Sequence, residues 1–166
     1  MHKHVVPHIM KTDIEIKIEL AKLEDLNELQ NLFVETINST CRNDYNERQL
    51  KVWNLSIENK ERWINKLNTQ YFIKARINKK IVGFGSLENG KYVDLIYVHK
   101  NHLRQGIANL LFENLKNESV RLGFDKLTSD VSITAKPFFE MKGFKIIKKN
   151  TNIINDVEII NYHMSE

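Results

Sequence analysis

A turn of small and polar residues carries the clearest chemical signal in this 166-residue chain. An apolar run ends at Val98, and Arg104-Gln105-Gly106-Ile107-Ala108 then opens a long amphipathic segment. The first backbone N–H groups of a helix have no intrahelical partner, and they lie at the positive end of the helix dipole. Such a helix start binds phosphate groups. Gly106 leaves the backbone open to an anion, and Arg104 adds a cation.

A carboxylate inside an apolar strand is the best candidate for a catalytic base. On strict alternation, Asp94 shares one strand face with Tyr92, Ile96 and Val98, and the other face holds Val93, Leu95 and Tyr97. A carboxylate in such surroundings needs a partner or a chemical task. Asp94 therefore either acts as a general base or forms a salt bridge with a Lys or Arg.

Other titratable residues are weaker candidates. Asp130, near the end of the next predicted strand, is a second candidate base. Tyr162 and Tyr97 are candidate acids, with packing in the core as the alternative for each. His99 and His102 are expected on the surface of the loop that precedes Gly106.

Hydrophobic periodicity predicts the elements that position these residues. The predicted strands cover residues 14–19, 71–77, 81–87, 92–98, 126–131, 144–150 and 156–164. The predicted helices follow Asp25, occupy one or two segments within 46–67, run from Gly106 to Gly123, and cover 135–142. Short turns make the second to fourth strands an antiparallel meander, and the helix after 92–98 makes the strand that follows it parallel. The order is β-α-α-β-β-β-α-β-α-β-β.

Two segments carry a family resemblance. Leu103–Ala108 resembles the acyl-CoA-binding motif of the GNAT superfamily of N-acetyltransferases, Gln/Arg-x-x-Gly-x-Gly/Ala, with Leu103 where Gln or Arg is usual. Ser132–Phe144 resembles that family's Asn-x-x-Ala-x-x-Phe-Tyr-Glu-x-x-Gly-Phe segment, with Ser132 for the usual Asn and Phe139 for the usual Tyr. A YafP-like subgroup is also similar at three places: Asp44-Tyr45, Gln49 to Trp53, and Asn161 to Met164.

The resemblance implies an α/β (α+β) fold of GNAT type, since the order of elements is the same. That fold has a mixed, mostly antiparallel central sheet of about six to seven strands, with helices on both faces. The resemblance also implies acetyl-CoA as cosubstrate, without a metal. It implies these cofactor-binding positions: Ile96, Tyr97, Val98, Leu103, Arg104, Gln105, Gly106, Ile107, Ala108, Asn109, Ser132, Phe138, Phe139 and Lys142.

The resemblance also assigns roles within the strand and the pockets. The backbone of Ile96–Val98 would pair with the pantetheine amides, and the N–H of Tyr97 or Val98 would stabilise the oxyanion. In many GNAT enzymes the motif Tyr protonates the departing thiolate, which Phe139 cannot do. Another group then acts as acid, or the thiolate leaves without one. Phe33, Tyr45 and Trp53 are expected to line the acceptor pocket.

Composition limits the classes of protein that fit. Apolar residues make up 42% and charged residues 28%, which is ordinary for a globular chain, and we expect one domain over 14–166. Residues 1–13 read as a mobile extension, with metal binding by His2, His4 and His8 as the alternative. A single cysteine, Cys41, fits a reducing compartment, and no apolar run approaches a membrane span, so we expect a cytoplasmic protein.

Charge bears on the partners. Lys and Arg number 25 against 21 Asp and Glu, and these basic residues are dispersed, which disfavours nucleic acid as a partner. We expect transfer of an acetyl group directly from acetyl-CoA to a primary amine of a small acceptor. The alternatives are a non-catalytic acyl-CoA sensor and a toxin that acetylates aminoacyl-tRNA. The chain is expected to be a monomer or a homodimer, in which the C-terminal strands mediate the contact, and no membrane partner is expected.

Overall fold

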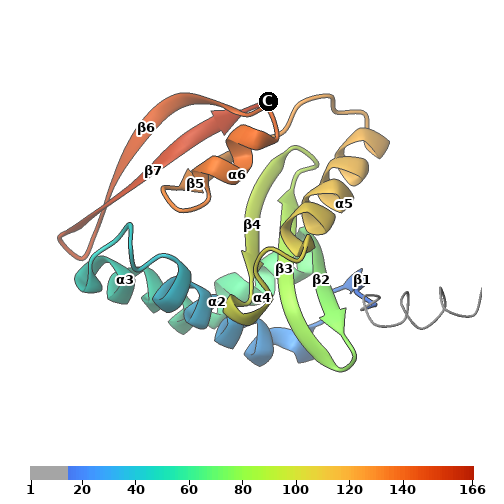
Figure 1. Ribbon diagram of the computed structural model, residues 1–166, viewed down its shortest axis with the longest axis horizontal. Coiled ribbons are helices and arrows are strands. Elements are labelled where there is room, and N and C mark those ends of the chain that lie inside the picture. The colour runs from blue at the N-terminus through green and yellow to red at the C-terminus, as the bar shows by residue number, and fades with distance from the viewer. Residues whose placement is uncertain (1–14) are drawn as a thin grey trace, which may run out of the picture.

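The computed structural model describes residues 15–166 (Figure 1). The extension predicted over 1–13, with its three histidines, and Ile14 of the first predicted strand lie outside the described residues. The strands are β1 (Lys17–Leu20), β2 (Tyr71–Ile77), β3 (Lys80–Glu88), β4 (Tyr92–Val98), β5 (Thr128–Ser132), β6 (Lys145–Ile154) and β7 (Val157–Ser165). The helices are α2 (Leu26–Thr40), α3 (Glu47–Asn54), α4 (Lys60–Thr69), α5 (Ile107–Arg121) and α6 (Lys136–Met141). Short 3-10 turns are η2 (Leu23–Asp25), η3 (Leu55–Glu58) and η4 (Lys100–His102).

The described strands form one sheet in the order β1-β2-β3-β4-β5-β7-β6. All neighbours pair antiparallel except β4 and β5, which are parallel and are connected through α5. This confirms the mixed, mostly antiparallel sheet, and the order of elements is the predicted one except that three helices, α2, α3 and α4, precede β2 where the order had two. The last hairpin is longer than predicted, since β6 continues past 150 to Ile154 while paired with β7. Its turn is Asn155-Asp156, and both residues have positive φ, as a tight two-residue hairpin requires.

Helices cover both faces of the sheet, as predicted (Figure 1). On one face α5 and α6 contribute Leu111, Leu115 and Phe139 to a core cluster with β3, β4 and β5. On the other face α2 and α4 contribute a second cluster that includes Phe33 and Trp63. Helix α5 packs closely on the sheet, because a Cβ on Gly83 in β3 would lie 3.0 Å from Ile107 Cγ2 in α5.

A β-bulge at Asp94 changes which residues of β4 face which helices. Pairing with β3 steps from Leu95 opposite Ser86 to Val93 opposite Leu87, so Asp94 has no partner on β3. Strict alternation through Asp94 was therefore wrong. Val93 belongs to the same core cluster as Ile96 and Val98, whereas Leu95 and Tyr97 pack against the opposite cluster. Bulges bend a strand and re-aim its side chains, and they occur often beside active sites.

The two central strands diverge directly after they meet. β4 and β5 pair only at Tyr92 and Thr128, their first residues. Because parallel strands run in the same direction, the remaining residues of β4 and β5 separate toward their C-terminal ends. The sheet is thus split at its centre, and the split separates the β1–β4 half from the β5–β7 half.

Candidate active site

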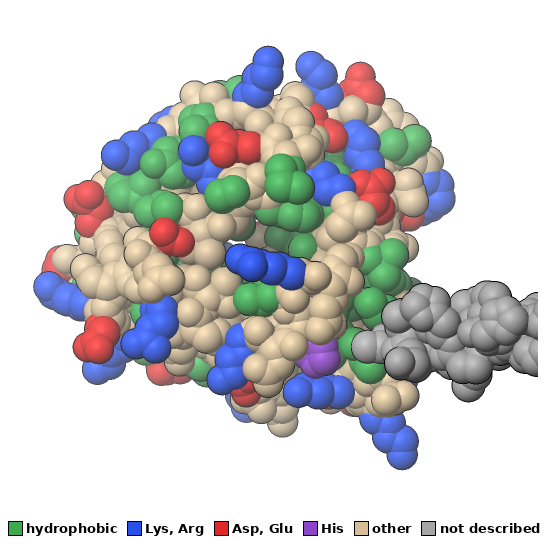
Figure 2. Space-filling view, viewed as in Figure 1, with side chains coloured by type: hydrophobic (Ala, Val, Ile, Leu, Met, Phe, Trp, Pro, Cys, Tyr) green, Lys and Arg blue, Asp and Glu red, His purple; other side chains and the backbone are tan. Residues whose placement is uncertain are grey.

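A cavity of about 820 Å³ occupies the split between β4 and β5. It is lined by β4 and β5 themselves, by Ala135 and Phe139 beside α6, and by Phe33 and Lys66 on the opposite face. The cavity therefore connects the α5/α6 face of the sheet with the α2/α4 face. Figure 2 shows the molecule hollowed near the centre of this view, between the region of the β6–β7 hairpin and the helices.

The edge of β4 that faces this cavity has free backbone groups. His99 N–H donates to Val82 O of β3 at 2.8 Å, and successive residues of a strand point their backbone groups to opposite edges. The N–H groups of Val98 and Ile96 therefore point away from β3, toward the cavity, while that of Tyr97 points toward β3. Thr36 Oγ1 in α2 donates to Val98 O at 3.0 Å, which fixes the end of the strand. Of the two oxyanion donors predicted, only Val98 has the required orientation.

The predicted anion-binding turn has the expected geometry. Gly106 is the N-cap of α5 with φ 82°, and a Cβ placed there would meet nothing within 4 Å. The first intrahelical bond joins Leu110 N to Gly106 O at 3.0 Å. Within 15–166, no backbone N–H from Gln105 to Asn109 donates to another protein group. Five backbone donors are therefore without a protein acceptor at the positive end of a 15-residue helix.

The side chains of the turn have different surroundings. Leu103 lines the cavity, while Arg104 is exposed with φ 60°. Gln105 Oε1 lies 3.2 Å from His102 Nδ1, which ties the turn to η4. Ile107 is buried in the core and Ala108 packs against it, so both can contribute only backbone groups to a ligand.

Asp94 is held beside the cavity by two residues of the α4 region. Its carboxylate pairs with Lys66 Nζ and accepts from Gln70 Nε2 at 2.9 Å. The salt bridge that was the alternative for Asp94 is therefore present, and Asp94 and Lys66 both line the cavity. The Asp94 side chain is 17% exposed. Lys66 and Gln70 were missed; Lys66 lies near the end of the predicted helical region, and Gln70 lies beyond it, directly after α4.

Asp130 lies on the other wall, within a separate polar network. It accepts from Tyr92 OH at 2.5 Å and from Asn150 Nδ2 at 3.0 Å, and His163 Nδ1 lies 3.0 Å away. Burial and the Asp130 carboxylate raise the pKa of Tyr92 above its ordinary value. Asp130 thus has three partners with its side chain 35% exposed, whereas Asp94 has two partners and is 17% exposed.

Aromatic side chains form the wall on the α2/α4 side. Phe33, Tyr45 and Trp53, which were predicted for the acceptor pocket, all line the cavity. Tyr97 also lines it, with ring centroids 4.9 Å from Phe33 and 5.3 Å from Phe84. Burial raises the pKa of Tyr97, so its hydroxyl keeps its proton. Tyr45 is already committed, since its hydroxyl accepts from Ile133 N and donates to Ile160 O, and burial raises its pKa to about 12.

The segment around α6 supplies the remaining predicted cofactor positions. Phe139 lines the cavity but is only 1% exposed, and Phe138 packs against Phe112 beside it. Ser132 Oγ accepts from Ala135 N at 3.0 Å and so stabilises the turn before α6. Lys142 Nζ bonds to Asn109 and lies 3.1 Å from Glu113, which ties α6 to α5 outside the cavity lining.

One prediction of location was wrong. His99 is not on the surface but 6% exposed, because its Nδ1 accepts from Asn101 N at 3.1 Å and its Nε2 lies 2.9 Å from Glu35. Burial lowers the pKa of His99. Tyr162 packs against the α5/α6 cluster, which is the alternative given for it, and it does not line the cavity; Lys136 Nζ lies 5.7 Å from its ring.

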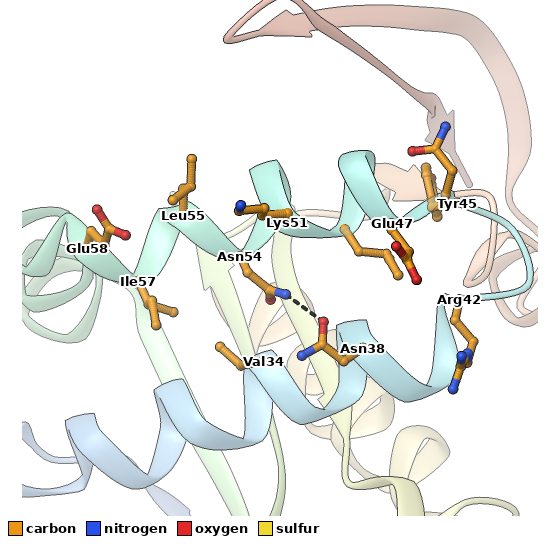
Figure 3. A pocket seen from close by; sticks show the side chains of 12 residues that line it. Val34, Asn38, Arg42, Tyr45, Glu47, Lys51, Asn54, Leu55, Ile57 and Glu58 are labelled. Atoms are coloured by element: carbon orange, nitrogen blue, oxygen red, sulfur yellow. Dashed lines mark hydrogen bonds between the residues drawn. The ribbon is translucent and has the colours of Figure 1, made fainter.

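A second hollow, of about 690 Å³, lies between α2 and α3 (Figure 3). Asn54 Nδ2 donates to Asn38 Oδ1 across it at 2.7 Å, and Arg42, Lys51, Glu47 and Glu58 surround it. None of the predicted cofactor or catalytic residues lines this hollow. The cavity between β4 and β5 is instead lined by eight of them: Asp94, Ile96, Tyr97, Val98, Leu103, Asp130, Ser132 and Phe139.

Comparisons with known proteins agree with this geometry. The family model for the acetyltransferase (GNAT) domain matches residues 41–166. The uncharacterized N-acetyltransferase YafP of Escherichia coli (strain K12) is 34% identical over 142 residues, covering 84% of this chain and 88% of that protein. A GCN5-related N-acetyltransferase from Rhodopseudomonas palustris has a similar structure, with a TM-score of 0.88, 25% identity, and coverage of 93% of this chain and 97% of that one.

A further solved structure extends the likeness in fold. PaiA N-acetyltransferase from Thermoplasma acidophilum, in complex with coenzyme A, matches with a TM-score of 0.78 at 18% identity, over 92% of this chain and 99% of that one. Within residues 15–166, no helix is both long and apolar enough to cross a membrane. The same described part of the chain holds no group of three or more His, Cys, Asp or Glu side chains arranged to bind a metal.

Proposed function

The chain belongs to the GNAT acetyltransferase family and is an acyltransferase, and we propose that it transfers acetyl directly from acetyl-CoA to a primary amine of a small acceptor. One observation carries this proposal: a single cavity connects the two faces of the sheet through the split between β4 and β5. The thioester and the amine can therefore enter from opposite faces and meet without a covalent enzyme intermediate.

The cofactor half of the proposal rests on unpaired backbone donors. The N–H groups at the start of α5 hold the pyrophosphate of acetyl-CoA, and Arg104 adds a positive charge beside it. The free edge of β4 at Ile96 and Val98 pairs with the pantetheine amides as an added strand would. The Val98 N–H is then the donor for the carbonyl oxygen of the thioester as that oxygen gains negative charge.

Asp94 is the proposed base. The amine must lose a proton as its nitrogen attacks the thioester carbon, and Asp94 accepts that proton directly or through one water. Lys66 and Gln70 hold the carboxylate in position at the bulge, so they act as positioning residues. As the new C–N bond forms, the C–S bond breaks and the thiolate leaves.

No hydroxyl is available to the leaving thiolate at the position where the family usually has Tyr, because residue 139 in the cavity wall is Phe. A thiol pKa near 8.5 makes the thiolate an acceptable leaving group near neutral pH without an acid. Tyr97 is the alternative proton donor, because it lines the same cavity and its hydroxyl is protonated. We expect a slower reaction than a Tyr at position 139 would allow, by about 10²–10⁴-fold.

Two measurements test the proposal in sequence. Thermal unfolding with acetyl-CoA, CoA or ATP comes first, and acetyl-CoA at a hundredfold excess over Kd should stabilise the protein by about 2.7 kcal/mol. Release of free thiol is then followed with primary amines. Stabilisation by acetyl-CoA but not ATP, followed by amine-dependent thiol release, is the expected result. No stabilisation by either CoA species would overturn the proposal.

A non-catalytic acyl-CoA sensor is the second candidate, and the absence of a hydroxyl on Phe139 favours it. A sensor predicts stabilisation by acetyl-CoA without thiol release for any amine. The same two measurements therefore separate the two functions.

A further inference from the structure

Apolar side chains rim the mouth of the cavity on its acceptor side. Ile153 and Ile154, at the tip of the β6–β7 hairpin, and Leu55 in η3 line the cavity and are exposed. Gln49 Nε2 donates to Glu158 O at 2.7 Å, which ties the hairpin to α3 next to η3. Figure 2 shows hydrophobic side chains gathered over the region of this hairpin. Exposed apolar residues grouped around a cavity mark a binding site for an apolar body.

Deeper in the same cavity, the wall is aromatic and rigid. Tyr97 is stacked on Phe84 and contacts Phe33, whose ring lies 5.2 Å from that of Trp63. Trp53 is half-buried, with its ring 5.2 Å from Tyr45. Aromatic faces attract ammonium groups as well as apolar surface.

The charges along the cavity exclude a polycationic acceptor. The lining holds two carboxylates, Asp94 and Asp130, against two cations, Arg62 and Lys66. Asp94 is paired with Lys66, and Asp130 already has His163 and Tyr92 as partners. A second or third ammonium on the acceptor would find no carboxylate free of a partner in this lining, and Arg62 would repel it.

We propose that the acceptor is a primary monoamine with an aromatic or branched apolar body. This inference rests on the proposed acetyl transfer and names its substrate class. The amine lies near Asp94, the body packs against Trp53 and Tyr97, and the far end contacts Ile153, Ile154 and Leu55.

A panel of amines of different chemistry tests the class, with kcat/KM measured by thiol release. The panel contains 2-phenylethylamine, ethylamine, spermidine and glucosamine. The highest value is expected for 2-phenylethylamine. A higher value for ethylamine, spermidine or glucosamine would overturn the inference while leaving the proposed acetyl transfer intact. If no amine releases thiol, the proposed transfer itself fails.

A matched pair of variants tests the apolar rim. Ile153 and Ile147 are both on β6 and are 71% and 64% exposed, but only Ile153 lines the cavity. Ile153→Gln should lower the kcat/KM ratio of 2-phenylethylamine over ethylamine about tenfold, through KM. Ile147→Gln should leave this ratio unchanged. Equal ratios in the two variants would show that the hairpin does not contact the acceptor and would overturn the inference.

Discussion

Replacing Gly106 with Ala tests whether the turn before α5 binds the phosphate groups of acetyl-CoA, because the change should block an anion while the protein still folds. Gly106 has φ 82°, where a Cβ costs about 1–2 kcal/mol, yet a Cβ there meets no protein atom within 4 Å. The Gly106→Ala variant can therefore fold with a small loss of stability. The new methyl group points into the space that a phosphate must enter to reach the free N–H groups, and each hydrogen bond to a charged oxygen contributes about 1.5–3 kcal/mol.

The same helix supplies a control for this change. Gly123, just after α5, has φ 95°, and a Cβ there also meets nothing within 4 Å. Gly123→Ala should therefore lose similar stability, about 2–8 °C in Tm for each variant. Isothermal titration with acetyl-CoA should show affinity weakened about 10–100-fold in Gly106→Ala and unchanged in Gly123→Ala. Equal affinities in the two variants would refute the placement of the pyrophosphate at the start of α5.

Three further predictions concern the base, the leaving group and the effect of pH. Asp94→Asn should lower kcat about 10²–10⁴-fold with little change in acetyl-CoA affinity. Asp130→Asn should lower kcat less than about tenfold. Steady-state thiol release measures both variants, and equal losses of kcat would contradict Asp94 as the base. Phe139→Tyr should raise kcat if a hydroxyl at this position reaches the thiolate, and a stable variant with unchanged kcat would place the acid elsewhere. Because the folded-state pKa of His99 is lowered, the unfolded chain binds more protons, so the free energy of unfolding should fall as pH drops below about 6.5. Denaturant unfolding between pH 5 and 8 should show a shallower fall in His99→Gln, and an equally steep one would assign the fall to other groups.

The sequence predicts the fold well because its apolar periodicity and its turns agree with one another. The run from Tyr71 to Val98 holds three mostly apolar segments, and the short turns between them allow only an antiparallel meander. The helix from Gly106 is bounded by two glycines with positive φ, which mark its ends. Residues that depend only on local geometry, such as the Gly106 turn, are therefore identifiable without the structure.

Features that depend on contacts distant in sequence were missed. The bulge at Asp94 arises from its register with Ser86 and Leu87, which no pattern within β4 reveals. His99 is buried because Glu35, far away in the sequence, lies beside it. Likewise, the apolar rim exists because the β6–β7 hairpin reaches α3, whereas the sequence placed Ile153 in the connection between the last two predicted strands.

Formation of the acetylated amine is the most direct test of the central claim. Purified protein is incubated with acetyl-CoA and 2-phenylethylamine, and N-acetylated product and free CoA are quantified by mass spectrometry. Product and CoA in a one-to-one ratio, with both strongly reduced in Asp94→Asn, are the predicted result. Intact acetyl-CoA in the presence of protein that binds it, with this amine and with every other amine of the panel, would contradict acetyl transfer and leave a protein that only binds acyl-CoA.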